Sequence, residues 1–276
     1  ADTIEPADRA KALGWLSAAT SLGVMLGPVI GSFAAHWGQE APGLVAAGLN
    51  LLNVGFAWRW LPEPPRHAAQ PLRRPAWHAA WEVVRHPRSR VPRLIWIYAA
   101  GMLGFSAMTS ILSLYLGAEF GITEKTIGYV FLYVGALSLV MRSLVLGPVV
   151  RKVGETGAMR AGTVLLMTGL LIYPLADNLW TLALVIPFVP IGTALLFPAT
   201  TSLMSQASDR SELGTTMGVA QTFAGMSRVI APLMATSAFQ RFGHGSPFLV
   251  AGAIVAVVGI LAFQITPVPR PEPEQA

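Results

Sequence analysis

Eight apolar windows follow one another along this 276-residue chain. Each has about the 20 residues that a helix needs to cross the hydrocarbon core of a bilayer. A chain that crosses hydrocarbon has to be helical there, because its backbone groups find no other hydrogen-bond partners. A soluble helical protein is the alternative, but its helices would need polar faces, whereas this chain is 53% hydrophobic and 12% charged. We therefore predict an all-α membrane protein. The predicted spans lie near residues 13–35, 42–61, 94–117, 127–149, 160–176, 179–202, 214–238 and 247–266.

The first and seventh spans resemble each other at an offset of 204 residues. An Asp-Arg pair precedes each of them, Gly14 corresponds to Gly218, and Pro28 corresponds to Pro232. A period of this length indicates a duplicated half-protein, as in many transporters, and not a short solenoid repeat.

Basic residues are distributed unequally between the two sides of the predicted membrane. Of the 19 Lys and Arg residues, fifteen fall in loops on one side, and Lys125 and Arg241 fall on the other. Loops rich in Lys and Arg stay in the cytoplasm, so we expect both ends of the chain to be cytoplasmic in a multi-pass protein of the cell (inner) membrane. The net charge of +5 reflects this topology, and we expect the lipid bilayer, and no nucleic acid, as a partner.

Residues 62–92 are rich in Pro and Arg and do not form a span. A short helix is predicted between Pro75 and Pro87, since proline favours the first turn of a helix and ends one that reaches it. Trp77, Trp81 and Val84 fall on one face of that helix, which is typical of an amphipathic helix lying on lipid headgroups. A disordered linker is the alternative.

Two motifs resemble a known family. GVMLGPVIGS, residues 23–32, is similar to the antiporter signature G-x-x-x-G-P-x-x-G-[GS] in the fifth helix of major facilitator superfamily exporters of the drug:proton antiporter type. Gly147-Pro-Val-Val-Arg151-Lys152-Val-Gly154-Glu155 resembles the loop motif G-x-x-x-D-R-x-G-R between the eighth and ninth helices. Arg151 stands where the family usually has Asp, and Glu155 where it has Arg.

The resemblance implies a major facilitator-type helical bundle with eight transmembrane helices visible of an inferred twelve. The four missing helices are expected to precede this chain and to be its partners. The expected parts are a remnant of the N-terminal half at 1–61, a cytoplasmic central loop at 62–92, a C-terminal six-helix half at 93–266 and a cytoplasmic tail at 267–276.

Three glycines, Gly23, Gly27 and Gly31, recur at every fourth position of the first span. Such a stripe lets two helix backbones approach closely, and Pro28 bends the helix by removing one backbone donor. Two interpretations stay open and are compatible: tight packing alone, or a contact between the halves that seals the cavity against ion leak.

Aromatic and polar residues of four other spans could form a substrate-binding wall. The sixth span contains Pro187, Pro190 and Pro198, which predicts a broken or strongly kinked helix, and interrupted helices mark transporter binding sites. Aromatic rings and thioethers suit bulky apolar or cationic molecules, although each residue could instead pack in the core or against lipid. Arg228, near mid-depth, could contact substrate, hold the missing helices or bind an anion. The candidate residues are Tyr98, Met102, Phe105, Tyr133, Phe197, Gln221 and Arg228.

None of the 14 Asp and Glu residues falls at mid-depth of a predicted span. Proton coupling needs a titratable group inside the membrane, so a proton antiporter would have its coupling carboxylate in the missing helices. The alternative is a uniporter or a transporter driven by another ion. The leading prediction is a small-molecule exporter. An importer of sugars or organic anions is the alternative, and a membrane enzyme or receptor comes third. The sequence shows no nucleophile–base pair or metal-ligand cluster, and we expect no enzyme activity, metal or cofactor.

Overall fold

A computed structural model describes residues 19, 22–23, 26–27, 29–31, 33–38, 40–60, 76–123, 126–209 and 212–266. The described residues form helices and connecting turns, with no strand among them. The chain divides into two compact units. One comprises Ala1–Leu72 and Gly121–Val140, and the other comprises Arg73–Phe120 and Met141–Ala276.

The first unit contains the short 3-10 helix η1, Ala35–Trp37, and the helices α2, Ala41–Trp60, and α5, Ile127–Val140. Helix α2 buries none of its residues and is long and apolar enough to cross a membrane. Gly23, Gly27 and Gly31 are helical, and a Cβ added to any of them would meet no atom within 4 Å. The close helix contact of this stripe stays a prediction, and Pro28 lies outside the described residues.

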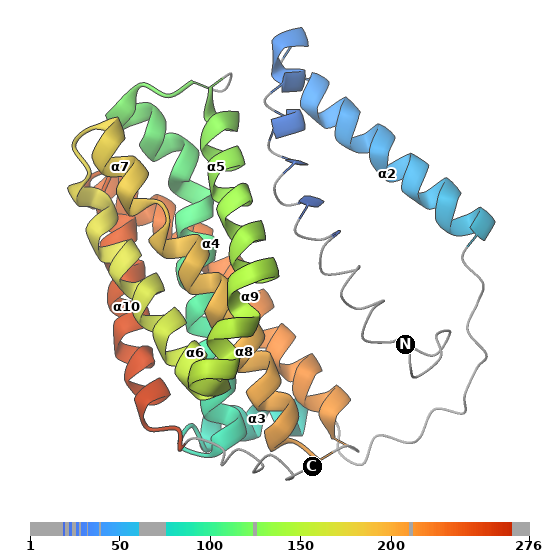
Figure 1. The fold of residues 1–276 in the computed structure, drawn as a ribbon, viewed down its shortest axis with the longest axis vertical. Coiled ribbons are helices and arrows are strands. Elements are labelled where there is room, and N and C mark those ends of the chain that lie inside the picture. The colour runs from blue at the N-terminus through green and yellow to red at the C-terminus, as the bar shows by residue number, and fades with distance from the viewer. Residues whose placement is uncertain are drawn as a thin grey trace. The chain divides into compact units, whose positions relative to one another are not determined.

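The second unit is a bundle of long helices (Figure 1). Helix α6 packs on α8, α4 packs on α9, and α10 packs on both α4 and α6. Its elements in chain order are α3 (Ala76–Arg85), α4 (Arg90–Phe120), η2 (Met141–Val145), α6 (Leu146–Ile172), η3 (Tyr173–Leu175), α7 (Leu179–Val185), α8 (Phe188–Ala207), α9 (Leu213–Phe242) and α10 (Ser246–Phe263).

One glycine separates two of the predicted spans. The apolar helical stretch from Ile127 to Leu175 has 49 residues and would be about 74 Å long if straight, more than twice the hydrocarbon thickness. It breaks at Gly154, whose φ of 74° lies in the left-handed region that glycine adopts without steric cost. The sequence predicted a loop from 150 to 159 between the two spans, whereas in the structure Gly154 alone has non-helical dihedral angles within α6.

The proline-rich span is interrupted at Ile186 and Pro187, although both residues keep right-handed helical dihedral angles. Helix α7 ends at Val185 and α8 begins at Phe188, so the break coincides with Pro187. Asn178 starts α7 by accepting hydrogen bonds from the backbone N–H groups of Trp180 and Thr181, each 2.9 Å long. Pro198 lies inside α8 without ending it.

Five helical stretches among the described residues are long and apolar enough to cross a membrane. They are 41–60, 90–120, 127–175, 179–207 and 246–263. The seventh predicted span is present as α9, but it is not one of the five. Its polar residues, which include Gln221 and Arg228, lower its mean hydropathy. The all-α membrane fold is confirmed, while the number of eight spans stays a prediction.

Close backbone contact joins α6 to α8. A Cβ at Gly162 would lie 2.5 Å from the backbone N of Leu196, and a Cβ at Gly192 would lie 2.6 Å from the backbone N of Leu166. Both distances are shorter than any real Cβ contact, so only glycine allows the two helices to approach this closely. This crossing holds α8 in place beside the candidate site.

Candidate functional site

An aromatic cluster forms where α4 meets α8. The ring of Phe197 contacts the ring of Tyr98 edge-on at a centroid distance of 5.3 Å and that of Phe105 at 6.4 Å. Tyr98 and Phe105 are two helical turns apart and therefore share one face of α4. Gly101 lies between them, and a Cβ there would be 2.5 Å from Leu196 Cδ2 and 3.3 Å from Phe197 Cε1. The missing side chain at this position gives Phe197 the space to reach both rings.

Helix α9 adds polar groups to the cluster. The side-chain amide of Gln221 donates a hydrogen bond to the Tyr98 hydroxyl at 3.4 Å. Ser227, on the buried side of α9, donates to the backbone carbonyl of Ala99 at 2.9 Å and ties α9 to α4. Arg228 is exposed and lies two turns beyond Gln221, so both side chains belong to the same face of the helix.

Only some of the seven candidate residues lie close together in the structure. Tyr98, Phe105, Phe197 and Gln221 form a chain of contacts, in which Phe197 contacts the rings of Tyr98 and Phe105, and Gln221 donates a hydrogen bond to Tyr98. Met102 is buried one turn after Tyr98. Tyr133 is on α5, which belongs to the first unit, and its role in the site stays a prediction. The gathered residues offer aromatic faces and an amide, which suits dispersion and cation–π contacts to an apolar or cationic molecule.

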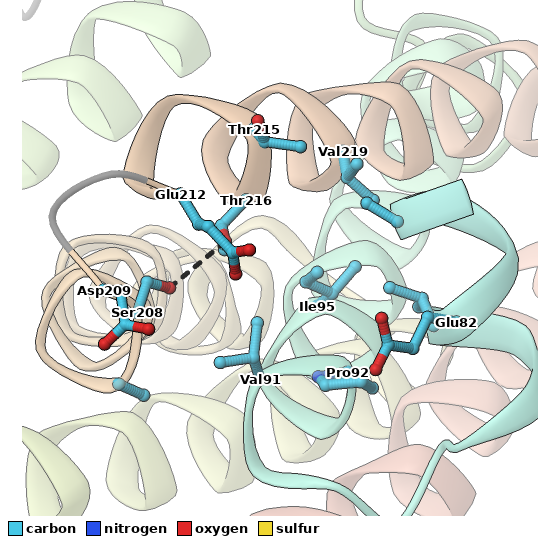
Figure 2. A pocket seen from close by; sticks show the side chains of 13 residues that line it. Glu82, Val91, Pro92, Ile95, Ser208, Asp209, Glu212, Thr215, Thr216 and Val219 are labelled. Atoms are coloured by element: carbon cyan, nitrogen blue, oxygen red, sulfur yellow. Dashed lines mark hydrogen bonds between the residues drawn. The ribbon is translucent and has the colours of Figure 1, made fainter. Parts of the chain in front are cut away.

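A pocket lies at one end of the same helices, where α3, α4, α8 and α9 meet (Figure 2). Its volume is about 250 Å³. The Ser208 hydroxyl donates to the Thr216 hydroxyl at 3.2 Å across its polar side. Three carboxylates are among the groups that line it, and a carboxylate attracts cations and repels anions. The acidic lining residues are Glu82, Asp209 and Glu212, and the apolar ones include Val83, Val91, Pro92, Ile95 and Val219.

Sequence reasoning missed this pocket. Glu82 lies in the segment treated as a central loop, whereas Asp209 and Glu212 lie between two spans more than 120 residues further on. The available signal was the position of all three acids in regions predicted to be cytoplasmic. That signal places the three carboxylates on one side of the membrane without showing that they meet.

The loop motif has an unexpected partner. Glu155, which follows the break at Gly154, accepts hydrogen bonds from the Gln206 amide at 3.1 Å and from the Ser202 hydroxyl at 3.4 Å. Both donors are on α8 and neither is charged. Arg151 is exposed, as are Gly147 and Lys152. Glu155, which stands where the family motif has Arg, therefore accepts hydrogen bonds from neutral side chains of the neighbouring helix.

The chain is similar to known transport proteins. The model of the Major Facilitator Superfamily matches it over residues 1–191 and 143–276. Multidrug resistance protein 2 of Bacillus subtilis (strain 168) is 28% identical over 275 residues, which cover 94% of this chain and 65% of that protein. Tetracycline resistance protein, class B, of Escherichia coli is 25% identical over 245 residues, which cover 85% of this chain and 58% of that protein.

A solved structure has the same fold. The human organic anion transporter MFSD10 (TETRAN) superposes with a TM-score of 0.57 at 20% identity, and the match covers 62% of this chain and 40% of that one. This chain thus spans 65% and 58% of the length of the two bacterial relatives.

Proposed function

Because the chain belongs to the Major Facilitator Superfamily, we propose that it works as part of a secondary active transporter that exports small molecules by alternating access. The family consists of multi-pass membrane proteins that move small molecules and do not convert them chemically. The two bacterial relatives are longer than this chain, and we propose that the active transporter includes helices in addition to those of residues 1–276.

The observation that carries the proposal is the cluster of Tyr98, Phe105, Phe197 and Gln221. It joins three helices of the expected C-terminal half, α4, α8 and α9, and transporters of this kind bind their substrate where the two halves meet. Aromatic rings beside one amide bind apolar and cationic molecules with little dependence on their detailed shape, which suits a broad-specificity exporter.

Export is favoured over import by two observations. Both bacterial relatives carry names of resistance proteins, and resistance follows from removal of a compound. The acidic pocket lies at the ends of α8 and α9 that the distribution of basic residues assigns to the cytoplasm of a bacterial inner membrane. A molecule that leaves the cell would meet this pocket first.

Proton coupling is part of the proposal. Every Asp and Glu of residues 1–276 falls in a loop or at the end of a predicted span. The titratable group that exchanges protons for substrate would therefore be on a helix outside these residues. The glycine stripe Gly23, Gly27 and Gly31 with Pro28 would then serve as the contact on which the halves move without leaking protons.

The test measures transport in both directions. The gene in its full length is expressed in a bacterium that lacks its own efflux pumps, and cells are loaded with a cationic fluorescent dye. We expect dye loss that stops when a protonophore removes the proton gradient. Accumulation of sugars or organic anions in the same cells, without dye loss, would support the importer instead. Dye loss that continues without a proton gradient would refute proton coupling alone.

A further inference from the structure

Helix α3 has two apolar flanks, and only one of them is covered. The helix predicted between Pro75 and Pro87 is present as residues 76–85 and packs on α4 and α9. Val83 is buried, and its backbone carbonyl accepts a hydrogen bond of 3.2 Å from the indole N–H of Trp96 on α4. This contact fixes the rotation of α3 about its own axis, so the direction of its other flank is fixed as well.

The other flank carries large apolar side chains that are exposed. Trp77 is 65% exposed, Trp81 is 51% exposed and Val84 is 48% exposed. Their positions i, i+4 and i+7 place them in one row along the helix. Indole rings prefer a location that is apolar at one end and wet at the other, as in the headgroup region of a membrane.

Positive charge continues directly from this row. The guanidinium of Arg85 lies over the ring of Trp81, 5.3 Å from its centroid. Arg88 and Arg90, in the short connection to α4 and at its first residue, are exposed. The acid of the helix, Glu82, lines the pocket shown in Figure 2. The exposed flank of α3 therefore combines indoles with Arg85, Arg88 and Arg90 follow within five residues of its end, and the carboxylate of Glu82 lines the pocket.

We propose that this surface, formed by Trp77, Trp81, Val84, Arg85, Arg88 and Arg90 and called the α3 surface below, binds anionic phospholipid headgroups of the cytoplasmic leaflet. Charge complementarity selects this occupant: basic residues beside interfacial indoles are attracted to acidic lipids and gain nothing from neutral ones. Since α3 is also a wall of the acidic pocket, bound lipid would hold that wall in place. The inference depends on the membrane location and not on the direction of transport.

The experiment detects lipid contact at the two indoles. The purified full-length protein is reconstituted into phosphatidylcholine vesicles that contain either brominated phosphatidylglycerol or the same fraction of brominated phosphatidylcholine. Bromine quenches tryptophan fluorescence at contact. Residues 1–276 contain 8 Trp residues, so the signal of Trp77 and Trp81 is obtained by subtracting that of a variant with Trp77→Phe and Trp81→Phe. We expect brominated phosphatidylglycerol to quench this difference signal more strongly than brominated phosphatidylcholine does.

Charge variants then test the arginines. Combined Arg85→Gln, Arg88→Gln and Arg90→Gln should lower the preference for phosphatidylglycerol by about fivefold for each arginine. Arg241→Gln, which removes an exposed arginine from the end of α9, is the matched control and should keep the preference. Equal quenching by the two brominated lipids would overturn the proposal. So would the absence of quenching by either lipid, which would show that protein covers the α3 surface.

Discussion

At the scale of single residues, Phe197 is the centre of the candidate site because it contacts both aromatic side chains of α4. We expect Phe197→Ala to weaken dye binding to the purified transporter about tenfold. The variant loses the contact between the Phe197 ring and an aromatic dye, and such a contact contributes about 0.5–1.5 kcal/mol to binding. Fluorescence titration measures the dissociation constant. Phe242→Ala is the control, because Phe242 is exposed at the end of α9 and should leave binding unchanged. Equal affinities of the two variants for the dye would show that Phe197 is not part of the binding site.

The role of the acidic pocket can be tested by substitution of Asp209. Its carboxylate lines the pocket, and a negative charge raises the local concentration of cations. We expect Asp209→Asn to raise KM for export of a cationic dye by roughly threefold and to leave KM for a neutral substrate unchanged. Transport kinetics in inside-out vesicles, where the cytoplasmic face is accessible, provide the measurement. An equal effect on both substrates would indicate a structural change and not an electrostatic one.

The site could be predicted from the sequence only in part. The spacing of Tyr98 and Phe105 placed them on one helix face, because that depends on the helical period alone. The contact of Gln221 with Tyr98 joins residues 123 positions apart, and no local pattern determines it. The same holds for Glu155, whose donors Ser202 and Gln206 are on another helix.

At the scale of elements, helix breaks were more predictable than helix contacts. Pro187 marked the break between α7 and α8 because proline lacks a backbone donor. Gly154 was recognised in the loop motif, but the sequence did not show that a single residue with positive φ would be enough to end a helix. The crossing of Gly162 and Gly192 was not predicted, since a glycine inside an apolar span has the same appearance whether or not a backbone faces it.

The crossing of α6 and α8 predicts a specific stability effect. Gly162→Ala would place its methyl group 2.5 Å from the backbone N of Leu196 and 2.7 Å from the carbonyl O of Gly192. Backbone atoms cannot rotate away, so we expect a loss of about 1–3 kcal/mol in the free energy of unfolding. Gly218→Ala on α9 is the control, because a Cβ there meets nothing within 4 Å and alanine favours a helix. Thermal unfolding in detergent should show a lower unfolding temperature for Gly162→Ala than for Gly218→Ala. An unfolding temperature of Gly162→Ala equal to that of the unsubstituted protein would contradict the close contact of α6 and α8.

The glycine stripe of the first span predicts an effect on transport instead. If a helix of the complete transporter packs against Gly27, Gly27→Leu would separate the two backbones at a cost of about 1–3 kcal/mol. We expect export to slow about tenfold, or protons to leak, while the protein still inserts and binds dye. Gly48→Leu is the control, as Gly48 lies outside the motif and a Cβ there is equally unobstructed. Export at the normal rate without a proton leak would show that the stripe has no role in transport.

At the scale of the whole molecule, hydropathy indicated the class of fold because the bilayer imposes it on any long apolar segment. It was less informative about α9, where polar residues lower the hydropathy of a helix that is nevertheless 30 residues long. Such a helix is tolerated in a membrane when its polar side chains face protein or a water-filled cavity. Gln221 and Arg228 are therefore consistent with a helix that borders the transport path.

The orientation of the chain in the membrane is the remaining prediction at this scale. Residues 1–276 contain no cysteine, so a single substitution introduces the one thiol of these residues, and labelling of the unsubstituted protein gives the background. Ser89, between α3 and α4, is expected in the cytoplasm because arginines surround it, whereas Arg241 at the end of α9 is expected outside. A membrane-impermeant maleimide added to intact cells should label Arg241→Cys and not Ser89→Cys, and permeabilised cells should show both. Labelling of Ser89→Cys in intact cells would place the acidic pocket at the outer face, where it could not receive a molecule on its way out of the cell.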